Sequence, residues 1–373
     1  MTPKIDVRRL MVVLCLAVLS AGVVACSDES STSAETKASS SSATDGSNSS
    51  KGIDASQPSP GTRKPSEGCS AAPPTSDLVN EARQLDSEGE ARDYLVTIPA
   101  AASTAGPVPV VVDLHGLLEG DVIHSTMSKF SDLGIKEGFA VITPNGSGVP
   151  LGWKASKPYE TNTDMVFINK VMDTVESEFC IDTTRRYATG LSNGAIMTSA
   201  LACAQPLDFA AVAPVAGIGT LKECDSKTPM PVLAIHGTAD PILVFNGGVG
   251  DLSQLLGTAD PSAAPQVTAL PEADLNGPGY PSHVAEWAKR NGCEPKPTDS
   301  NLPHTDGNPD LSVIRRVYDC PKGQDTEFYI VVGGGHSWPG SEFSKSIGAI
   351  VGPTSFDFMA AEVQWEFFKK FHR

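Results

Sequence analysis

The chain has 373 residues, a hydrophobic content of 40% and a formal net charge of -16 at pH 7. Apart from a polar N-terminal stretch, about 300 residues remain, enough for one large globular domain or two small ones. An acidic surface repels phosphate backbones, which argues against nucleic acid as a partner, and solubility explains the charge otherwise.

The N-terminus resembles an export signal. Lys4, Arg8 and Arg9 precede an apolar run over residues 10–24, which is short for a bilayer span and fits a secretory signal peptide. The run ends in Val23-Val24-Ala25-Cys26, which looks like a bacterial lipobox. We expect a signal peptide over residues 1–25 and acyl chains on Cys26 that hold an exported protein at the cell membrane. Ordinary signal-peptidase cleavage beside a chance cysteine is the alternative.

The next segment is polar. Residues 27–66 are rich in Ser, Thr, Asp and Gly, and Ile53 is their only large apolar residue. Such a segment buries too little surface to offset its conformational entropy. The sequence therefore predicts a disordered tether over residues 26–68 and a folded domain over residues 69–373.

Cysteine usage points to disulfides. Of eight cysteines, Cys15 lies in the leader and Cys26 is the expected lipid site, so six remain. An even number in an exported protein predicts three disulfides, although order alone does not decide the pairing. Short loops favour Cys203–Cys224 and Cys293–Cys320, which leaves Cys69–Cys180. No pair has the CxxC spacing of a zinc site, and we expect no metal or cofactor.

Strand-like and helix-like segments alternate in the predicted domain. In chain order the pattern predicts strands at 94–98, 110–114 and 139–143, a helix at 163–179, a strand at 187–189, a helix at 193–203, strands at 210–215 and 232–235, a helix at 283–290, a strand at 328–332 and a helix at 356–371. This alternation predicts an α/β fold with a mostly parallel sheet and helices on both faces. Residues 247–310 fit less well and either shape a pocket mouth or decorate the surface.

One short motif carries a candidate nucleophile. Gly190-Leu191-Ser192-Asn193-Gly194 has the form G-x-S-x-G, with a predicted strand before it and a helix after it. That context is typical of a nucleophile elbow, in which glycines avoid collisions and the serine sits near the positive end of a helix. We predict that Ser192 is the nucleophile; a Gly-Ser turn without chemistry is the alternative.

A serine hydroxyl needs a base, and the base needs an acid. His336 follows a predicted strand near the C-terminus, and Asp240 follows another strand in Ile235-His236-Gly237-Thr238-Ala239-Asp240. The order Ser, acid, His is that of α/β-hydrolases. We predict His336 as base and Asp240 as acid, although Asp240 alternatively caps a turn. His236 is interpreted as structural.

The oxyanion of an acyl-transfer reaction needs two donors. We predict the backbone N–H of Asn193 and that of Leu117, in the loop opened by His115-Gly116, and we interpret His115 as shaping that loop. Asp306-Gly307-Asn308-Pro309-Asp310 resembles the start of an EF-hand loop but lacks its final glutamate, so we interpret it as a turn.

These motifs together resemble the secreted polyhydroxybutyrate depolymerase and feruloyl esterase family of α/β-hydrolases. The resemblance covers roughly residues 91–371 and rests on Asp113-Leu114-His115-Gly116, Gly152-Trp153, Tyr187-Ala188-Thr189-Gly190-Leu191-Ser192-Asn193-Gly194, residues 211–217, His236-Gly237-Thr238-Ala239-Asp240, Trp287, Asn291-Gly292-Cys293 and Gly335-His336-Ser337-Trp338-Pro339-Gly340. It implies the α/β-hydrolase fold and places nucleophile, acid and base on Ser192, Asp240 and His336.

The chain departs from the family pattern at two places. Ala195 stands where members often carry glycine, and the oxyanion loop His115-Gly116-Leu117-Leu118 is not rich in cysteine or glycine. The second departure bears on pocket shape and hence on substrate. Trp153 and Trp338 either line a pocket for a flat acyl group or belong to the core.

Three functions remain from the sequence. The first is a serine ester hydrolase for hydroxyacyl or hydroxycinnamoyl esters, whose partners are the ester substrate and, through the lipid, the membrane. The second is a cell-envelope acyltransferase with the same three residues. The third is a non-catalytic binding lipoprotein, against which the complete Ser, Asp and His set argues.

Overall fold

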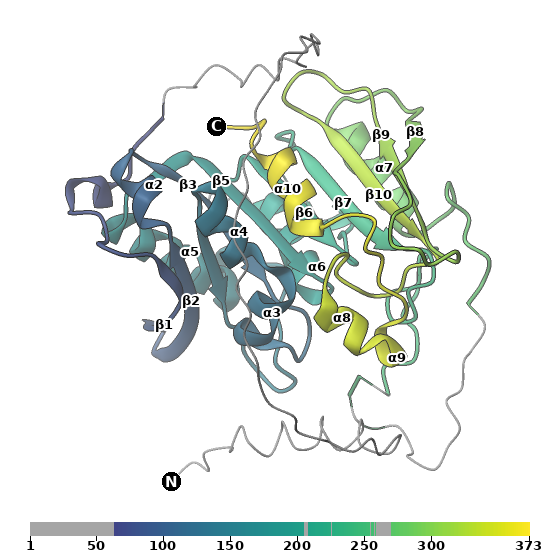
Figure 1. Ribbon diagram of the computed structural model, residues 1–373, viewed down its shortest axis with the longest axis horizontal. Helices are drawn as coiled ribbons and strands as arrows, with labels where there is room; N and C mark the ends of the chain where they lie inside the picture. Colours follow the sequence, from purple (N-terminus) through teal and green to yellow (C-terminus); the bar gives the residue numbers. More distant parts are fainter. Residues whose placement is uncertain (1–62, 205–207, 225, 254, 257, 259–269) are drawn as a thin grey trace, which may run out of the picture. The chain divides into compact units, whose positions relative to one another are not determined.

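The computed structural model describes residues 63–373 except 205–207, 225, 254, 257 and 259–269 (Figure 1). The predicted signal peptide, Cys26 and nearly all of the predicted tether lie outside these residues. Within the described part, no helix is both long and apolar enough to cross a membrane.

The described residues form a ten-stranded sheet with the order β1-β2-β4-β3-β5-β6-β7-β10-β9-β8. Its strands are β1 (Leu78–Ser87), β2 (Glu90–Ile98), β3 (Val108–Leu114), β4 (Ala140–Pro144), β5 (Ile181–Leu191), β6 (Ala211–Val215), β7 (Val232–Gly237), β8 (Thr298–Asn301), β9 (Ser312–Val317) and β10 (Thr326–Val332). The central strands from β4 to β10 pair in parallel, and antiparallel strands lie at both edges.

Helices cover both faces of the sheet (Figure 1). They are α2 (Ala100–Thr104), α3 (Gly120–Ser128), α4 (Phe130–Glu137), α5 (Thr163–Glu178), α6 (Asn193–Ala204), α7 (Tyr280–Arg290), α8 (Glu342–Ser346), α9 (Gly348–Val351) and α10 (Ala360–Phe368), with short 3-10 turns η1 (Glu67–Ser70), η2 (Tyr159–Thr161) and η3 (Leu221–Glu223).

Alternate residues of the central strands pack into two separate hydrophobic cores, one on each face of the sheet. Val112 and Ala188 belong to the core with apolar side chains of α5, α6 and α7, whereas Val111 and Tyr187 belong to the core with those of α3, α4 and α10. Successive side chains of a strand point to opposite faces, so a strand buried on both faces must be apolar throughout. This accounts for the valine-rich β3 and confirms the predicted α/β-hydrolase fold.

The structure differs from the prediction mainly at the sheet edges. The strands β1, β8 and β9 and the helices α3 and α4 were not predicted; β8 is exposed at every residue, so it has no apolar pattern to read. The C-terminal helix begins at Ala360 rather than 356. There the Asp357 carboxylate accepts the N–H groups of Thr305 and Asp306, which ties this segment to a neighbouring turn.

Three disulfides join Cys69 to Cys180, Cys203 to Cys224 and Cys293 to Cys320, which are the favoured pairs. Two residues before Cys69 hydrogen-bond to β5: the Ser66 N–H donates to Ile181 O at 2.9 Å, and Lys64 O accepts the Thr183 N–H at 2.9 Å. Lys64 and Ser66, which belong to the predicted tether, therefore pair with the start of β5. Backbone hydrogen bonds, which composition does not report, hold this polar segment on β5.

Candidate active site

The three residues of the predicted triad lie just beyond the carboxyl ends of three parallel strands. Ser192 follows β5, Asp240 follows β7 and His336 follows β10. These strands run parallel, with β6 between β5 and β7 and with β10 beside β7. Carboxyl ends of parallel strands meet at the same edge, where α/β folds bind their ligands.

Ser192 occupies a strained turn between β5 and α6. Its backbone φ is +56°, in the left-handed region that non-glycine residues rarely adopt. A Cβ on Gly190 or Gly194 would lie 2.6 Å or 2.2 Å from the Leu114 carbonyl oxygen at the end of β3. The glycines on both sides are therefore required by the close approach of β3. This is the geometry of a nucleophile elbow.

His336 and Asp240 form a buried pair. The imidazole Nδ1 of His336 lies 2.7 Å from Oδ2 of Asp240. An ionised carboxylate only accepts hydrogen bonds, so Nδ1 carries the hydrogen and Nε2 of a neutral ring is left free to accept a proton. Two further backbone hydrogen bonds, from Gly335 to Pro353 O and from His336 to Val351 O, hold the histidine loop.

Asp240 is completely buried and receives several donors. Its Oδ1 accepts the N–H groups of Ile242 and Leu243 at 2.8 Å each. Burial alone would raise the pKa of this carboxyl, but electrostatic attraction to the His336 imidazole and hydrogen bonds from His236 and His336 outweigh burial and hold the pKa well below its usual range. Asp240 is therefore ionised and held in one orientation.

His236, interpreted from the sequence as structural, touches Asp240 directly. Its Nε2 lies 2.9 Å from Leu243 O and 3.2 Å from Asp240 Oδ2. Both of these oxygens accept hydrogen bonds, so Nε2 carries a hydrogen. The ring also stacks on Tyr280 with centroids 3.7 Å apart. The i and i+4 spacing from Asp240, beyond a strand end, is the only trace of this contact in the sequence.

Both predicted oxyanion donors are available. The N–H groups of Leu117 and Asn193 donate to no residue that the structure describes, whereas the Leu118 N–H donates to Leu151 O at 2.9 Å. His115 shapes the loop: its Nδ1 lies 2.7 Å from Gly116 O and its Nε2 accepts the Gly146 N–H at 2.8 Å.

His115 is unsuited to the role of a base. Burial lowers its pKa to about 4, although a hydrogen bond to Gly116 O opposes that shift. Both ring nitrogens are already engaged, one as donor and one as acceptor. The ring is therefore a neutral part of the loop, as its position in the sequence indicated.

Comparison with known proteins adds the chemistry. The sequence model of the family described as "Putative esterase" matches residues 87–276, or 190 of the 373 residues. The chain belongs to this esterase family. It is 31% identical to "Probable feruloyl esterase C" of Aspergillus niger, over 57% of this chain and 75% of that one.

Two further relatives agree. The esterase is 30% identical to "Probable feruloyl esterase C" of Aspergillus flavus, over 61% of this chain and 78% of that one. It is also 29% identical to "Putative esterase NocK" of Nocardia uniformis, over 79% of this chain and 84% of that one. The chain is thus an esterase of the feruloyl esterase kind with the α/β-hydrolase fold.

The two tryptophans singled out in the sequence take different places in the esterase. Trp153 is nearly buried, and its indole N–H donates to His115 O at 2.9 Å, so it backs the oxyanion loop. Trp338 is buried in the core, with its ring 5.6 Å from that of His124 and 6.3 Å from that of Phe130. A pocket-lining role for either one stays a prediction.

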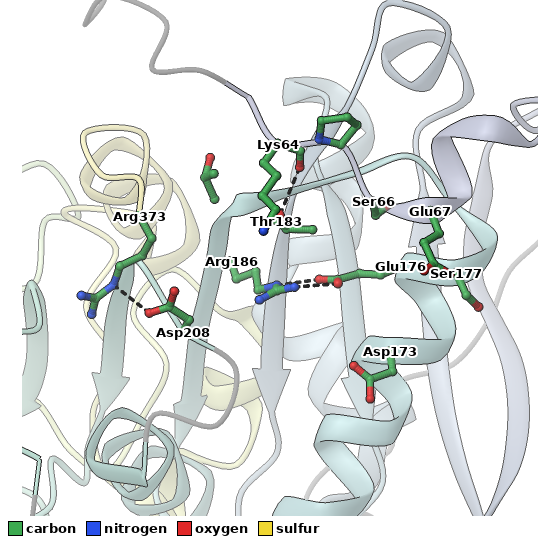
Figure 2. A pocket seen from close by; sticks show the side chains of 12 residues that line it. Lys64, Ser66, Glu67, Asp173, Glu176, Ser177, Thr183, Arg186, Asp208 and Arg373 are labelled. Carbon is green, nitrogen blue, oxygen red and sulfur yellow. Dashed lines mark hydrogen bonds and ion pairs between the residues drawn. The ribbon is translucent and has the colours of Figure 1, made fainter.

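A cavity of about 550 Å³, drawn in Figure 2, lies near the start of β5, whereas Ser192 follows the end of that strand. It is bordered by Arg186 near the start of β5 and by Asp208 before β6. Arg186 pairs with Glu176 at 2.6 Å and Arg373 with Asp208 at 3.6 Å. Charged groups that already pair with one another suit a solvated surface rather than an ester site.

One group of side chains in the described part has ligand atoms close enough for a metal: His304, Asp306 and Asp357. Their carboxylates are already used. Asp357 accepts the N–H groups of Thr305 and Asp306, and Asp306 accepts that of Phe356 at 3.0 Å. These hydrogen bonds hold the turn at residues 306–310, which resembles the start of an EF-hand loop in the sequence.

Proposed function

We propose that this esterase hydrolyses hydroxycinnamoyl or hydroxyacyl esters through an acyl-enzyme on Ser192. The observation that carries the proposal is the strained Ser192 elbow at the same sheet edge as the 2.7 Å His336–Asp240 pair. A nucleophile, an oriented base and an acid in one place suit acyl transfer.

In the proposed mechanism Ser192 Oγ attacks the ester carbonyl carbon while its proton passes to His336 Nε2. The N–H groups of Leu117 and Asn193 stabilise the negative oxygen of the tetrahedral intermediate. The intermediate then expels the alcohol, which takes the proton from His336, and an acyl group remains on Ser192. Water, deprotonated by His336, then attacks the acyl carbon, the bond to Ser192 Oγ breaks, and His336 returns its proton to Ser192 as the acid is released. Asp240 stays ionised and stabilises the imidazolium.

The relatives favour the hydroxycinnamoyl branch of this proposal, because two of them carry the name feruloyl esterase C at 30–31% identity. Polyester fragments such as 3-hydroxybutyrate oligomers are the other candidate. Two features bear on which acyl group binds. The leucines of the oxyanion loop suit an apolar acyl group, and the indole of Trp153 suits a flat aromatic one.

The test compares kcat/KM on methyl ferulate with kcat/KM on a 3-hydroxybutyrate oligomer, with Ser192→Ala as blank. We expect a preference for ferulate beyond about tenfold, or about 1.4 kcal/mol of transition-state discrimination. The reverse preference would make the protein a polyester-fragment hydrolase. Turnover of either ester by Ser192→Ala at the wild-type rate would contradict the serine mechanism. Transfer to an added alcohol without hydrolysis would make it an acyltransferase.

We also propose that the mature protein is anchored at the outer face of the cell membrane through acyl chains on Cys26. The lipobox-like Val23-Val24-Ala25-Cys26 and the polar segment after it support this proposal. In a bacterial host the full chain should fractionate with membranes, and Cys26→Ser should release it to the soluble exported fraction. Membrane association that persists in Cys26→Ser would contradict the anchor.

A further inference from the structure

A second charged cluster lies beneath the oxyanion loop, and the proposed mechanism does not use it. His124 of α3 is completely buried. Its Nε2 lies 2.8 Å from Asp113 Oδ1, and its Nδ1 lies 3.2 Å from Glu119 Oε2. Asp113 is also completely buried, and its Oδ2 accepts the Ser128 hydroxyl at 2.5 Å.

The geometry makes His124 a cation. Each ring nitrogen faces a carboxylate, and carboxylates accept hydrogen bonds, so both nitrogens carry hydrogen. Burial alone would lower the pKa of His124, but the charges of Asp113 and Glu119 and the hydrogen bonds to them raise it to about 10. The imidazolium is therefore charged at neutral pH and bridges two carboxylates.

The two carboxylates stand at the two ends of one loop. Asp113 is the penultimate residue of β3, and Glu119 directly precedes α3. Between them runs the oxyanion loop, residues 115–118, which carries Leu117. His124 thus joins the strand that enters this loop to the residue that leaves it.

Glu119 also joins the two ends of the oxyanion loop through hydrogen bonds to Gly116. Its Oε2 accepts the Gly116 N–H at 2.7 Å, and its own N–H donates to Gly116 O at 3.3 Å. The enclosed Leu118 has a backbone φ of +70°, and its N–H is taken by Leu151 O. The Leu117 N–H remains without a partner among the described residues. The position of this donor therefore depends on where Glu119 is held.

Stability alone is a poor explanation of such a cluster. Buried ion pairs are often neutral for stability when compared with apolar replacements, since desolvation offsets the attraction between the charges. Preorganised donors, in contrast, stabilise an oxyanion because they need not reorganise during the reaction. The location of the cluster at the loop that carries Leu117 matches the second purpose.

We propose that the Asp113–His124–Glu119 cluster is a positioning device that fixes the oxyanion loop and aims the Leu117 N–H at the carbonyl oxygen of the ester. The proposal rests on the proposed function, because it presumes an oxyanion formed by attack of Ser192. His124 and Glu119 are positioning residues, since they act through the loop and do not touch the ester.

The experiment uses the full chain and two variants, Glu119→Gln and His124→Gln. Glu119 is partly exposed, so its variant decides the question if His124→Gln fails to fold. The matched control is His304→Gln, which removes an exposed histidine that also pairs with a carboxylate, Asp357. For each we would measure kcat and KM on methyl ferulate, and inhibition by ferulic acid and by an arylboronic acid.

A boronic acid forms a tetrahedral adduct with the serine and places an oxygen in the oxyanion hole, whereas ferulic acid mimics only the bound ground state. We expect kcat to fall by at least about 10-fold in both variants, up to the about 100- to 1,000-fold that loss of one oxyanion donor costs. Boronate affinity should fall with kcat, while KM and ferulic acid affinity change less than about threefold. His304→Gln should match the wild type.

Two results would overturn the proposal. One is a kcat and a boronate affinity within about twofold of wild type in folded Glu119→Gln. The other is an equal loss of boronate and ferulic acid affinity, which marks general damage to the fold. Ser192→Ala separates this failure from that of the proposed function. If Ser192→Ala is inactive while Glu119→Gln is unimpaired, only the positioning proposal falls. If Ser192→Ala remains active, both fall.

Discussion

The side chain of Asn193 forms two hydrogen bonds with the backbone of Trp153. Its Oδ1 accepts the Trp153 N–H at 2.6 Å, and its Nδ2 donates to Trp153 O at 3.1 Å. Asn193 directly follows the candidate nucleophile, and Trp153 backs the oxyanion loop through its bond to His115 O. The residue whose backbone N–H is the proposed oxyanion donor thus also holds, through its side chain, the segment behind the oxyanion loop.

The first prediction concerns Asn193→Ala. The backbone N–H of residue 193 remains, but both polar groups of Trp153 lose their partner, and leaving buried groups unpaired costs about 1–3 kcal/mol. We expect kcat/KM on methyl ferulate to fall about 10-fold or more as the wall shifts. Asn193→Asp keeps the acceptor for the Trp153 N–H but sets a negative charge near Trp153 O and the oxyanion, so it should be worse. A kcat/KM higher in Asn193→Asp than in Asn193→Ala would contradict this account.

The sequence predicted Ser192, Asp240 and His336 because each follows a predicted strand, in the chain order nucleophile, acid, base. It did not predict the hydrogen bonds from the Asn193 side chain to Trp153 or the contact of His236 with Asp240. The Asn193 contact joins segments that meet only in the folded chain, whereas the His236 contact depends on the turn that follows β7. The strand β3 was predicted from its valines, whereas β8 was missed because a fully exposed strand leaves no apolar pattern. Glu119 and His124 look like surface residues of a helix start until β3 is placed beside them.

The second prediction is for His236→Phe. Phenylalanine preserves the stack on Tyr280 but removes the Nε2–H that lies 3.2 Å from Asp240 Oδ2 and 2.9 Å from Leu243 O. His336 and two backbone N–H groups still hold Asp240, so we expect a loss of about 3- to 30-fold in kcat with little change in KM. Ser192→Ala should lose far more, about a million-fold. A loss in His236→Phe that equals the loss in Ser192→Ala would show that His236 belongs to the reacting set.

The third prediction follows from the charge of His124. Its pKa is raised to about 10 in the folded protein, above the value of about 6.5 for a free histidine. A raised pKa means that its stabilising contribution is full below about pH 6.5 and is lost as pH rises through about 10. The Tm of the wild type should therefore drop more between pH 7 and pH 10.5 than the Tm of His124→Gln. Asp113 and Glu119 are the charged groups that face the ring, and the hydrogen bond and charge of His124 outweigh burial and lower the pKa of Glu119. Parallel Tm curves for the two proteins would contradict a buried imidazolium.

The fourth prediction concerns the disulfide between Cys69 and Cys180, which closes a loop with a sequence separation of 111 residues. A long loop restrains the unfolded chain strongly, so replacing both cysteines by alanine should lower the free energy of unfolding by about 2–5 kcal/mol. Cys180 lies before the first residue of β5, whereas Ser192 follows its last residue, so the bond is at the far edge of the sheet. At 25 °C kcat/KM on methyl ferulate should therefore stay at the wild-type value, while the midpoint of denaturant unfolding falls.

The matched control replaces Cys293 and Cys320, whose separation is 27 residues. By the same loop-entropy argument, loss of this shorter loop should cost less free energy of unfolding. A loss of activity in the folded Cys69 and Cys180 variant would mean that the N-terminal attachment on β5 is coupled to the nucleophile elbow at its other end.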